Sequence, residues 1–84
     1  MAENKAPIKI GFKILENAVR IAHEKGRNDL VPAFEGAIKE LKEYERNGHS
    51  TLDAHANEIV FRPFGNGNHE LQEEAMSGID DSSA

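Results

Sequence analysis

The stretch LVPAFEGAIKELKEYER, residues 30–46, decides the fold, because its apolar residues recur every three or four positions. This spacing matches the 3.6-residue turn of an α-helix and places those residues along one face. Asn28 or Asp29 is expected to cap the start of the helix, and Pro32 falls in the first turn, where proline is tolerated. The pair NG at 47–48 is typical of a helix end, because glycine readily takes a positive φ. The apolar stripe consists of Leu30, Phe34, Ala37, Ile38, Leu41 and Tyr44.

Residues 7–25 are predicted to form an earlier helix with the same period. A competing interpretation is a strand over 8–12, IKIGF, where apolar residues alternate. The helix is preferred because its spacing continues for ten more residues, although Gly11 weakens the first turn. Only KGRND, residues 25–29, separates the two helices, so they should pack as an antiparallel hairpin. The apolar stripe of this earlier helix consists of Ile8, Phe12, Leu15, Val19 and Ala22.

A third, shorter helix is expected at about 51–61. Ser50 would be its N-cap, with Asp53 in place of the usual glutamate of a capping box. Pro63 prevents the helix from continuing past about residue 62. The alternative is a strand over 58–64, EIVFRPF, but no second strand is available to pair with it.

The predicted fold is therefore mainly all-α: an antiparallel helical hairpin followed by a third short helix and a flexible acidic C-terminal tail. A chain of 84 residues allows one small domain. We expect a flexible N-terminus at 1–6 and a helical domain at 7–64. A loop, a frayed short helix and a disordered acidic tail should then occupy 65–84.

Composition excludes several classes of protein. The chain has no cysteine, so disulfides and thiolate metal sites are ruled out. No stretch approaches the ~20 apolar residues of a membrane-spanning helix, and a cytoplasmic location without membrane contact is expected. The formal net charge of −5 disfavours nucleic acid as a partner.

Residues that could carry chemistry lack the spacing of known motifs. Glutamates three residues apart occur at Glu40 and Glu43 and at Glu70 and Glu73, but the first pair lies opposite the apolar stripe and the second lies in a weakly helical segment. No serine or threonine comes with a plausible base and orienting acid. The chain is therefore predicted to be non-catalytic and to need no cofactor or metal. The four histidines, none of which forms a metal-ligand pair at i,i+4, are His23, His49, His55 and His69.

Two groups of apolar residues are predicted to contact a partner. Within FRPF the candidate residues are Phe61, Arg62 and Phe64, because two exposed aromatic rings would need cover. Ile14, Ala18 and Ile21 widen the apolar face of the 7–25 helix beyond what one neighbour can cover. The leading hypothesis is thus a small acidic interaction protein that binds, recruits or blocks another protein. It would be an adaptor, an inhibitor or a phage-like accessory protein, and it would assemble as a homo-oligomer.

An alternative hypothesis rests on the basic residues of the first half of the chain. Lys13 and Arg20 share one face of the 7–25 helix, and Arg27 lies in the connection that follows. Together they could hold a small anionic ligand, such as a nucleotide, at a junction between subunits. Solvated residues paired with nearby glutamates are the competing interpretation.

Overall fold

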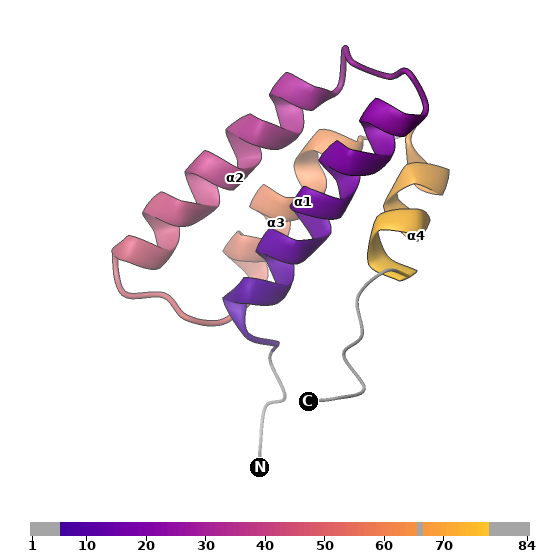
Figure 1. The fold of residues 1–84 in the computed structure, drawn as a ribbon. Coiled ribbons are helices and arrows are strands. Elements are labelled where there is room, and N and C mark those ends of the chain that lie inside the picture. The colour runs from indigo at the N-terminus through magenta and orange to yellow at the C-terminus, as the bar shows by residue number, and fades with distance from the viewer. Residues whose placement is uncertain (1–5, 66, 78–84) are drawn as a thin grey trace.

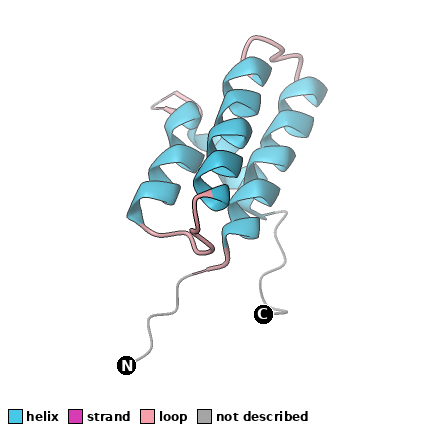
Figure 2. Cartoon of the chain, turned by 90° about the vertical axis from the view of Figure 1, so that its left-hand side faces the viewer, coloured by secondary structure: helices cyan, strands magenta, loops and turns pink. Residues whose placement is uncertain are grey.

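The fold is all-helical over the residues that the structure, a computed structural model, describes, namely 6–65 and 67–77. The predicted helical hairpin with further short helices is confirmed, and both segments with a strand alternative are helical instead. Figures 1 and 2 show helices joined by short loops. The elements are α1 (Ile8–Glu24), α2 (Val31–Arg46), α3 (Ala54–Phe61), the 3-10 turn η1 (Arg62–Phe64) and α4 (His69–Ser77).

The helix α1 is the central element of the fold. It packs against α2 to form the hairpin, and it also contacts α3 and α4 (Figure 1). The helix α3 contacts both members of the hairpin, and η1 contacts α2, α3 and α4. One core therefore runs through all of these elements, and its largest fully buried side chains are Phe34, Phe64, Leu15, Leu41, Ile59 and Val60.

Gly11 is required by the packing between α1 and α3. It is buried, and a Cβ atom placed on it would lie 2.8 Å from Cγ2 of Val60 and 3.0 Å from Cδ2 of Leu52. The residue that weakens the first turn of α1 on propensity grounds is thus the one that lets α3 and the preceding loop come close. Tertiary packing outweighs intrinsic propensity at this position.

The start of α2 differs from the prediction. Its N-cap is Leu30, without a side-chain hydrogen bond, so the expectation that Asn28 or Asp29 caps this helix was wrong. Both side chains have other partners: Oδ1 of Asn28 lies 3.1 Å from Nδ1 of His23, and Oδ1 of Asp29 lies 3.6 Å from Nε of Arg27. The polar residues of this connection therefore stabilise the turn itself.

The start of α3 also differs. Asp53 is the N-cap, with Oδ1 accepting a hydrogen bond from the backbone N–H of Ala56 at 3.0 Å, so the predicted cap at Ser50 was wrong. The carbonyl of Ser50 accepts instead from the N–H of Ile8 at 2.9 Å, and the N–H of Leu52 donates to the carbonyl of Ala6 at 2.8 Å. Residues 50–52 are held in this extended pairing, so the helix begins only after them.

The helix α4 packs firmly on α1, whereas the sequence predicted only a frayed helix in this part of the chain. Its Leu71 and Ala75 are buried. Nδ2 of Asn17 donates to the carbonyl of Ala75 at 3.2 Å, and Nζ of Lys25 lies 3.5 Å from Oε2 of Glu74. The predicted flexible N-terminus and the acidic end of the chain lie outside the described residues, except that Ala6 is described.

Candidate functional site

The apolar face of α1 that was predicted to bind a partner is covered within the chain. Ile14, Ala18 and Ile21 are all buried. They lie on the same face as Asn17, which donates a hydrogen bond to α4, and Lys25, which lies near Glu74 of α4. Within the chain α4 supplies the second neighbour that this face needs, so the predicted contact of these three residues with a partner stays a prediction. The homo-oligomer stays a prediction, but this face no longer argues for it.

The segment FRPF is divided between core and surface. Phe64 is fully buried, with its ring centroid 4.9 Å from that of Phe34 and 6.1 Å from that of Phe61, which is half-buried. Phe64 is thus part of the core of the single chain, and its predicted contact with a partner stays a prediction. Arg62 stays accessible, with 57% of its side chain exposed, and Pro63 is half-buried. The exposed half of the segment borders a groove.

This groove, called the α2–η1 groove below, lies between α2 on one side and α3 with η1 on the other. Its volume is about 300 Å³. Small and apolar side chains line most of it, and a loose ion pair closes one rim, with Nη1 of Arg62 3.7 Å from Oε1 of Glu40. The lining residues are Ala33, Gly36, Ala37, Glu40, Ile59, Arg62 and Pro63.

Gly36 is the unusual residue of the α2–η1 groove. It lies in the interior of α2, where glycine destabilises a helix by roughly 0.5–1 kcal/mol relative to alanine. Among the described residues, a Cβ atom placed on it would meet nothing within 4 Å, in contrast to Gly11. Its φ is not positive, unlike that of Gly26, Gly48 and Gly65. Neither the packing nor the backbone of the described chain requires a glycine here.

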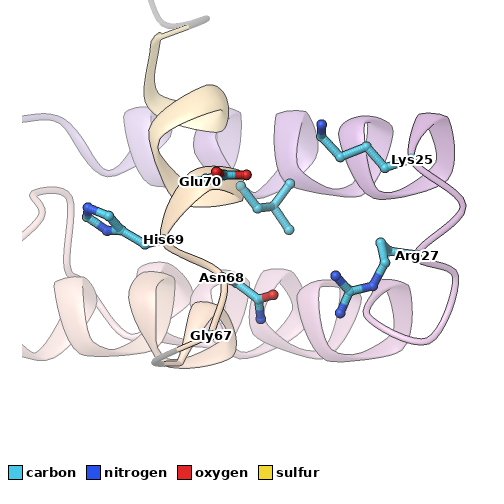
Figure 3. Close-up of a pocket in the computed structure, with 7 residues that line it drawn as sticks. Lys25, Arg27, Gly67, Asn68, His69 and Glu70 are labelled. Atoms are coloured by element: carbon cyan, nitrogen blue, oxygen red, sulfur yellow. The ribbon is translucent and has the colours of Figure 1, made fainter.

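A second hollow, of about 320 Å³, lies between the end of α1 and the first turn of α4 (Figure 3). Lys25 and Arg27 border it, but each already lies near a carboxylate: Lys25 near Glu74 at 3.5 Å, and Arg27 near Asp29 at 3.6 Å. A further carboxylate also lines the hollow, whose residues are Lys25, Arg27, Gly67, Asn68, His69, Glu70 and Leu71. Its positive charge is thus largely compensated.

The three cations of the predicted anion site do not come together. Arg27 lines the hollow, whereas Nη1 of Arg20 lies 3.3 Å from Oε2 of Glu24 on the surface of α1. Lys13 is exposed and lies about three turns before the end of α1, roughly 16 Å along the axis from Glu24. Lys13, Arg20 and Arg27 therefore form no common pocket within one chain, and the predicted anion site at a junction between subunits stays a prediction.

Ionisable side chains also gather where α2 approaches α3. The hydroxyl of Tyr44 donates to Oδ2 of Asp53 at 2.7 Å, so the N-cap of α3 is tied to α2. The ring of His49 stacks on that of Tyr44 with centroids 3.9 Å apart, and the ring of His55 lies 4.8 Å away. These contacts give the cluster a structural role at the junction. Across the described residues, no group of three or more potential metal ligands of the His, Cys, Asp or Glu type occurs.

Tyr44 should titrate above the ordinary range of tyrosine. The hydrogen bond to Asp53 raises the pKa of Tyr44 above the ordinary 10.0, and desolvation and the negative charge of Asp53 raise it further. The protonated form is favoured by folding, so its contribution to stability is present below pH 10 and is lost as the pH rises through the folded-state pKa. The chain has one tyrosine and no tryptophan, so ultraviolet absorbance of the phenolate follows Tyr44 alone. If the pH midpoint of this absorbance titration lay at or below that of free tyrosine in the wild type, the hydrogen bond to Asp53 would be contradicted. Asp53→Asn removes the charge but can still cap α3, so it should lower the midpoint.

Comparisons of the chain with protein-family models, with curated proteins and with solved structures find no match. Over the residues that the structure describes, no helix is long and apolar enough to cross a membrane. Among the residues that line the α2–η1 groove, Arg62 was predicted from the sequence, whereas Ala33, Gly36 and Ile59 were not. The available signal was a glycine and an alanine on the otherwise charged side of α2.

Proposed function

We propose that this protein is a small non-catalytic binding protein that docks another protein in the α2–η1 groove. The observation that carries the proposal is Gly36, a helix-interior glycine that the chain does not need for its own packing. A missing side chain at an exposed helix position lets a second backbone approach closely. A groove of this size, with an apolar lining and a charged rim, suits a partner's side chains or helix edge.

A binding role agrees with the state of the ionisable groups. Catalytic sites commonly hold side chains with strongly shifted pKa values in a cleft. The raised pKa of Tyr44 has a structural cause, the bond to the carboxylate that caps α3, and Tyr44 does not line the α2–η1 groove. The raised pKa of Tyr44 is therefore no sign of a catalytic group in this groove.

Substitutions at Gly36 should separate stability from binding. Gly36→Ala is expected to raise the free energy of unfolding by about 0.5–1 kcal/mol, because the new Cβ meets no neighbour and the helix gains propensity. Gly36→Leu should also fold, but its side chain should fill the groove and abolish docking. Urea unfolding followed by circular dichroism measures the first effect. Quantitative capture from lysate, with each variant immobilised, measures the second.

The matched control for Gly36→Leu is Lys42→Leu, which places the same side chain on another face of α2, beside Phe12. The Lys42→Leu variant should capture the same proteins from the lysate as the wild type does. Only proteins captured by the wild type and by Lys42→Leu, yet lost with Gly36→Leu, support the proposal. Equal capture by all three baits would refute it.

The alternative function, binding of a small anion, is kept because Lys25, Arg27 and the first turn of α4 line one hollow. Inorganic phosphate and nucleotides would then raise the melting temperature, since a ligand of the folded state stabilises it. Arg27→Gln should remove that increase. Under the proposal made above, none of these anions changes the melting temperature.

A further inference from the structure

Negative charge is in excess beside the α2–η1 groove, because Glu40 and Arg62 line it and Glu58, next to the lining residue Ile59, also lies near Arg62. Arg62 lies 3.7 Å from Glu40 and 4.0 Å from Glu58, so two carboxylates share one guanidinium. All three side chains are at least half exposed, with exposed fractions of 50% for Glu40, 57% for Arg62 and 64% for Glu58. A partner that brings a cation to this rim would complete a second pair and complement the remaining charge.

The floor of the groove sets the shape of the partner. Ala33, Gly36 and Ala37 offer little or no side chain along one side of α2. Helices usually pack with their axes 8–10 Å apart, and small residues at the crossing point allow the lower end of that range. A second helix can therefore cross α2 at Gly36, provided that its own contact residues are small enough to enter the groove.

We infer that the α2–η1 groove takes an α-helix of another protein, with small side chains on its contact face and a lysine or arginine beside Glu40 and Glu58. This inference rests on the proposed function and names the chemistry of the partner. The recognition is of the helix-in-groove type, in which contact residues recur at i, i+3, i+4 and i+7. The basic residue would fix the orientation of the bound helix, because its cation must lie at the end of the groove that is next to Glu40 and Glu58.

A second copy of the chain fits this chemistry poorly. If two α2 helices crossed at Gly36 in parallel, Glu40 would face Glu40 of the other copy. In the antiparallel arrangement Glu40 would face Pro32. Like charges or an uncharged residue would then oppose the acidic rim, and like charges held opposite each other destabilise an interface. The charge pattern thus favours a foreign, basic helix.

A peptide titration tests this inference directly. The probe is a synthetic helix of about 20 residues, long enough to be helical in isolation, with alanine along one face and lysine beside it. Backbone amide shifts of the isotope-labelled protein, recorded by nuclear magnetic resonance, should change at residues 33–40 and 59–62. A peptide with glutamate in place of lysine should bind at least about tenfold more weakly, a difference of about 1.4 kcal/mol. A peptide with leucine in place of the facing alanines should also lose affinity.

Variants of the protein complete the test. Gly36→Leu should abolish the amide shifts, and Lys42→Leu should keep them. Glu40→Gln combined with Glu58→Gln should remove the preference for lysine over glutamate, because both groups are exposed and glutamine keeps their size. Equal binding of the two peptides, shifts at the hollow beside Arg27, or no shifts at all would overturn the inference.

Two further outcomes are distinguishable. Shifts of the same amides on simple concentration of the protein, without peptide, would identify a second copy as the occupant and would also overturn the inference. If Gly36→Leu no longer captures the lysate proteins but the lysine peptide does not bind the wild type, the inference of a basic partner helix is overturned. The proposed function is still supported in that case. If the capture of lysate proteins does not depend on Gly36, the proposed function is itself refuted, and the inference that rests on it is refuted as well.

Discussion

Phe64→Ala is expected to lower the free energy of unfolding by about 3–5 kcal/mol, which is the usual effect of removing a buried phenylalanine ring. Phe64 is fully buried and lies against Phe34 of α2, so its loss leaves a cavity where η1 joins the core. Domains typically have about 0.05–0.15 kcal/mol of stability per residue, so this chain has roughly 4–12 kcal/mol in total. The substitution should therefore remove a large share of its stability. Urea unfolding followed by far-ultraviolet circular dichroism measures the change.

Phe61→Ala is the control for that experiment. Phe61 is half-buried and packs against the edge of the core, so its removal opens less new cavity and should cost clearly less than the loss of Phe64. The comparison also tests the division of FRPF between core and surface. Equal losses for the two variants would mean that both rings share one environment, contrary to the structure.

Gly11→Ala should destabilise the fold by about 1–2 kcal/mol, although alanine is the better helix former. Helix propensity alone would add roughly 0.5–1 kcal/mol. The new Cβ would lie 2.8 Å from Cγ2 of Val60, which is fully buried, and 3.1 Å from Cδ2 of Leu41. Overpacking of this kind typically costs about 1–3 kcal/mol, so the steric term outweighs the propensity term.

The same substitution at Gly36 provides the contrast. Gly11→Ala and Gly36→Ala make an identical chemical change in two helices, yet they should move the urea midpoint in opposite directions. The sign is set by what the Cβ atom meets, which is Val60 in one case and open space in the other. A stabilising Gly11→Ala would show that α1 and α3 are farther apart than the structure has them.

The helical hairpin could be predicted because the pattern that indicates each helix lies within that helix's own stretch of sequence. The apolar residues of 30–46 repeat with the period of a helix, and tertiary contacts later confirm what that period indicates. The caps were harder to predict, because Ser50 and Asp53 are both good cap residues three positions apart. The choice between them is made by the pairing of Ser50 with Ile8, a residue more than forty positions earlier in the chain.

The candidate site could be predicted only in part, for two physical reasons. The apolar face with Ile14 and Ile21 indicated that cover was needed, but a sequence does not say whether a helix of the same chain or of a partner provides it. The helix that does so has only Leu71 and Ala75 as buried anchors, too few for a strong periodic signal. The groove at Gly36 depends on empty space beside an absent side chain, and that space is visible only once α2 and η1 are placed.

The central position of α1 has a consequence for how this protein can change over time. The buried residues of α1 face α2, α3 and α4, so a substitution of one of them should disturb the packing of several elements and be tolerated rarely. The outer side of α2 near Ala33 and Gly36 differs, because both residues are exposed and their substitution should not disturb the core. Mutations can therefore accumulate there without loss of folding. The fold thus separates a helix whose buried residues are shared by most of the core from a face where substitutions should leave folding intact.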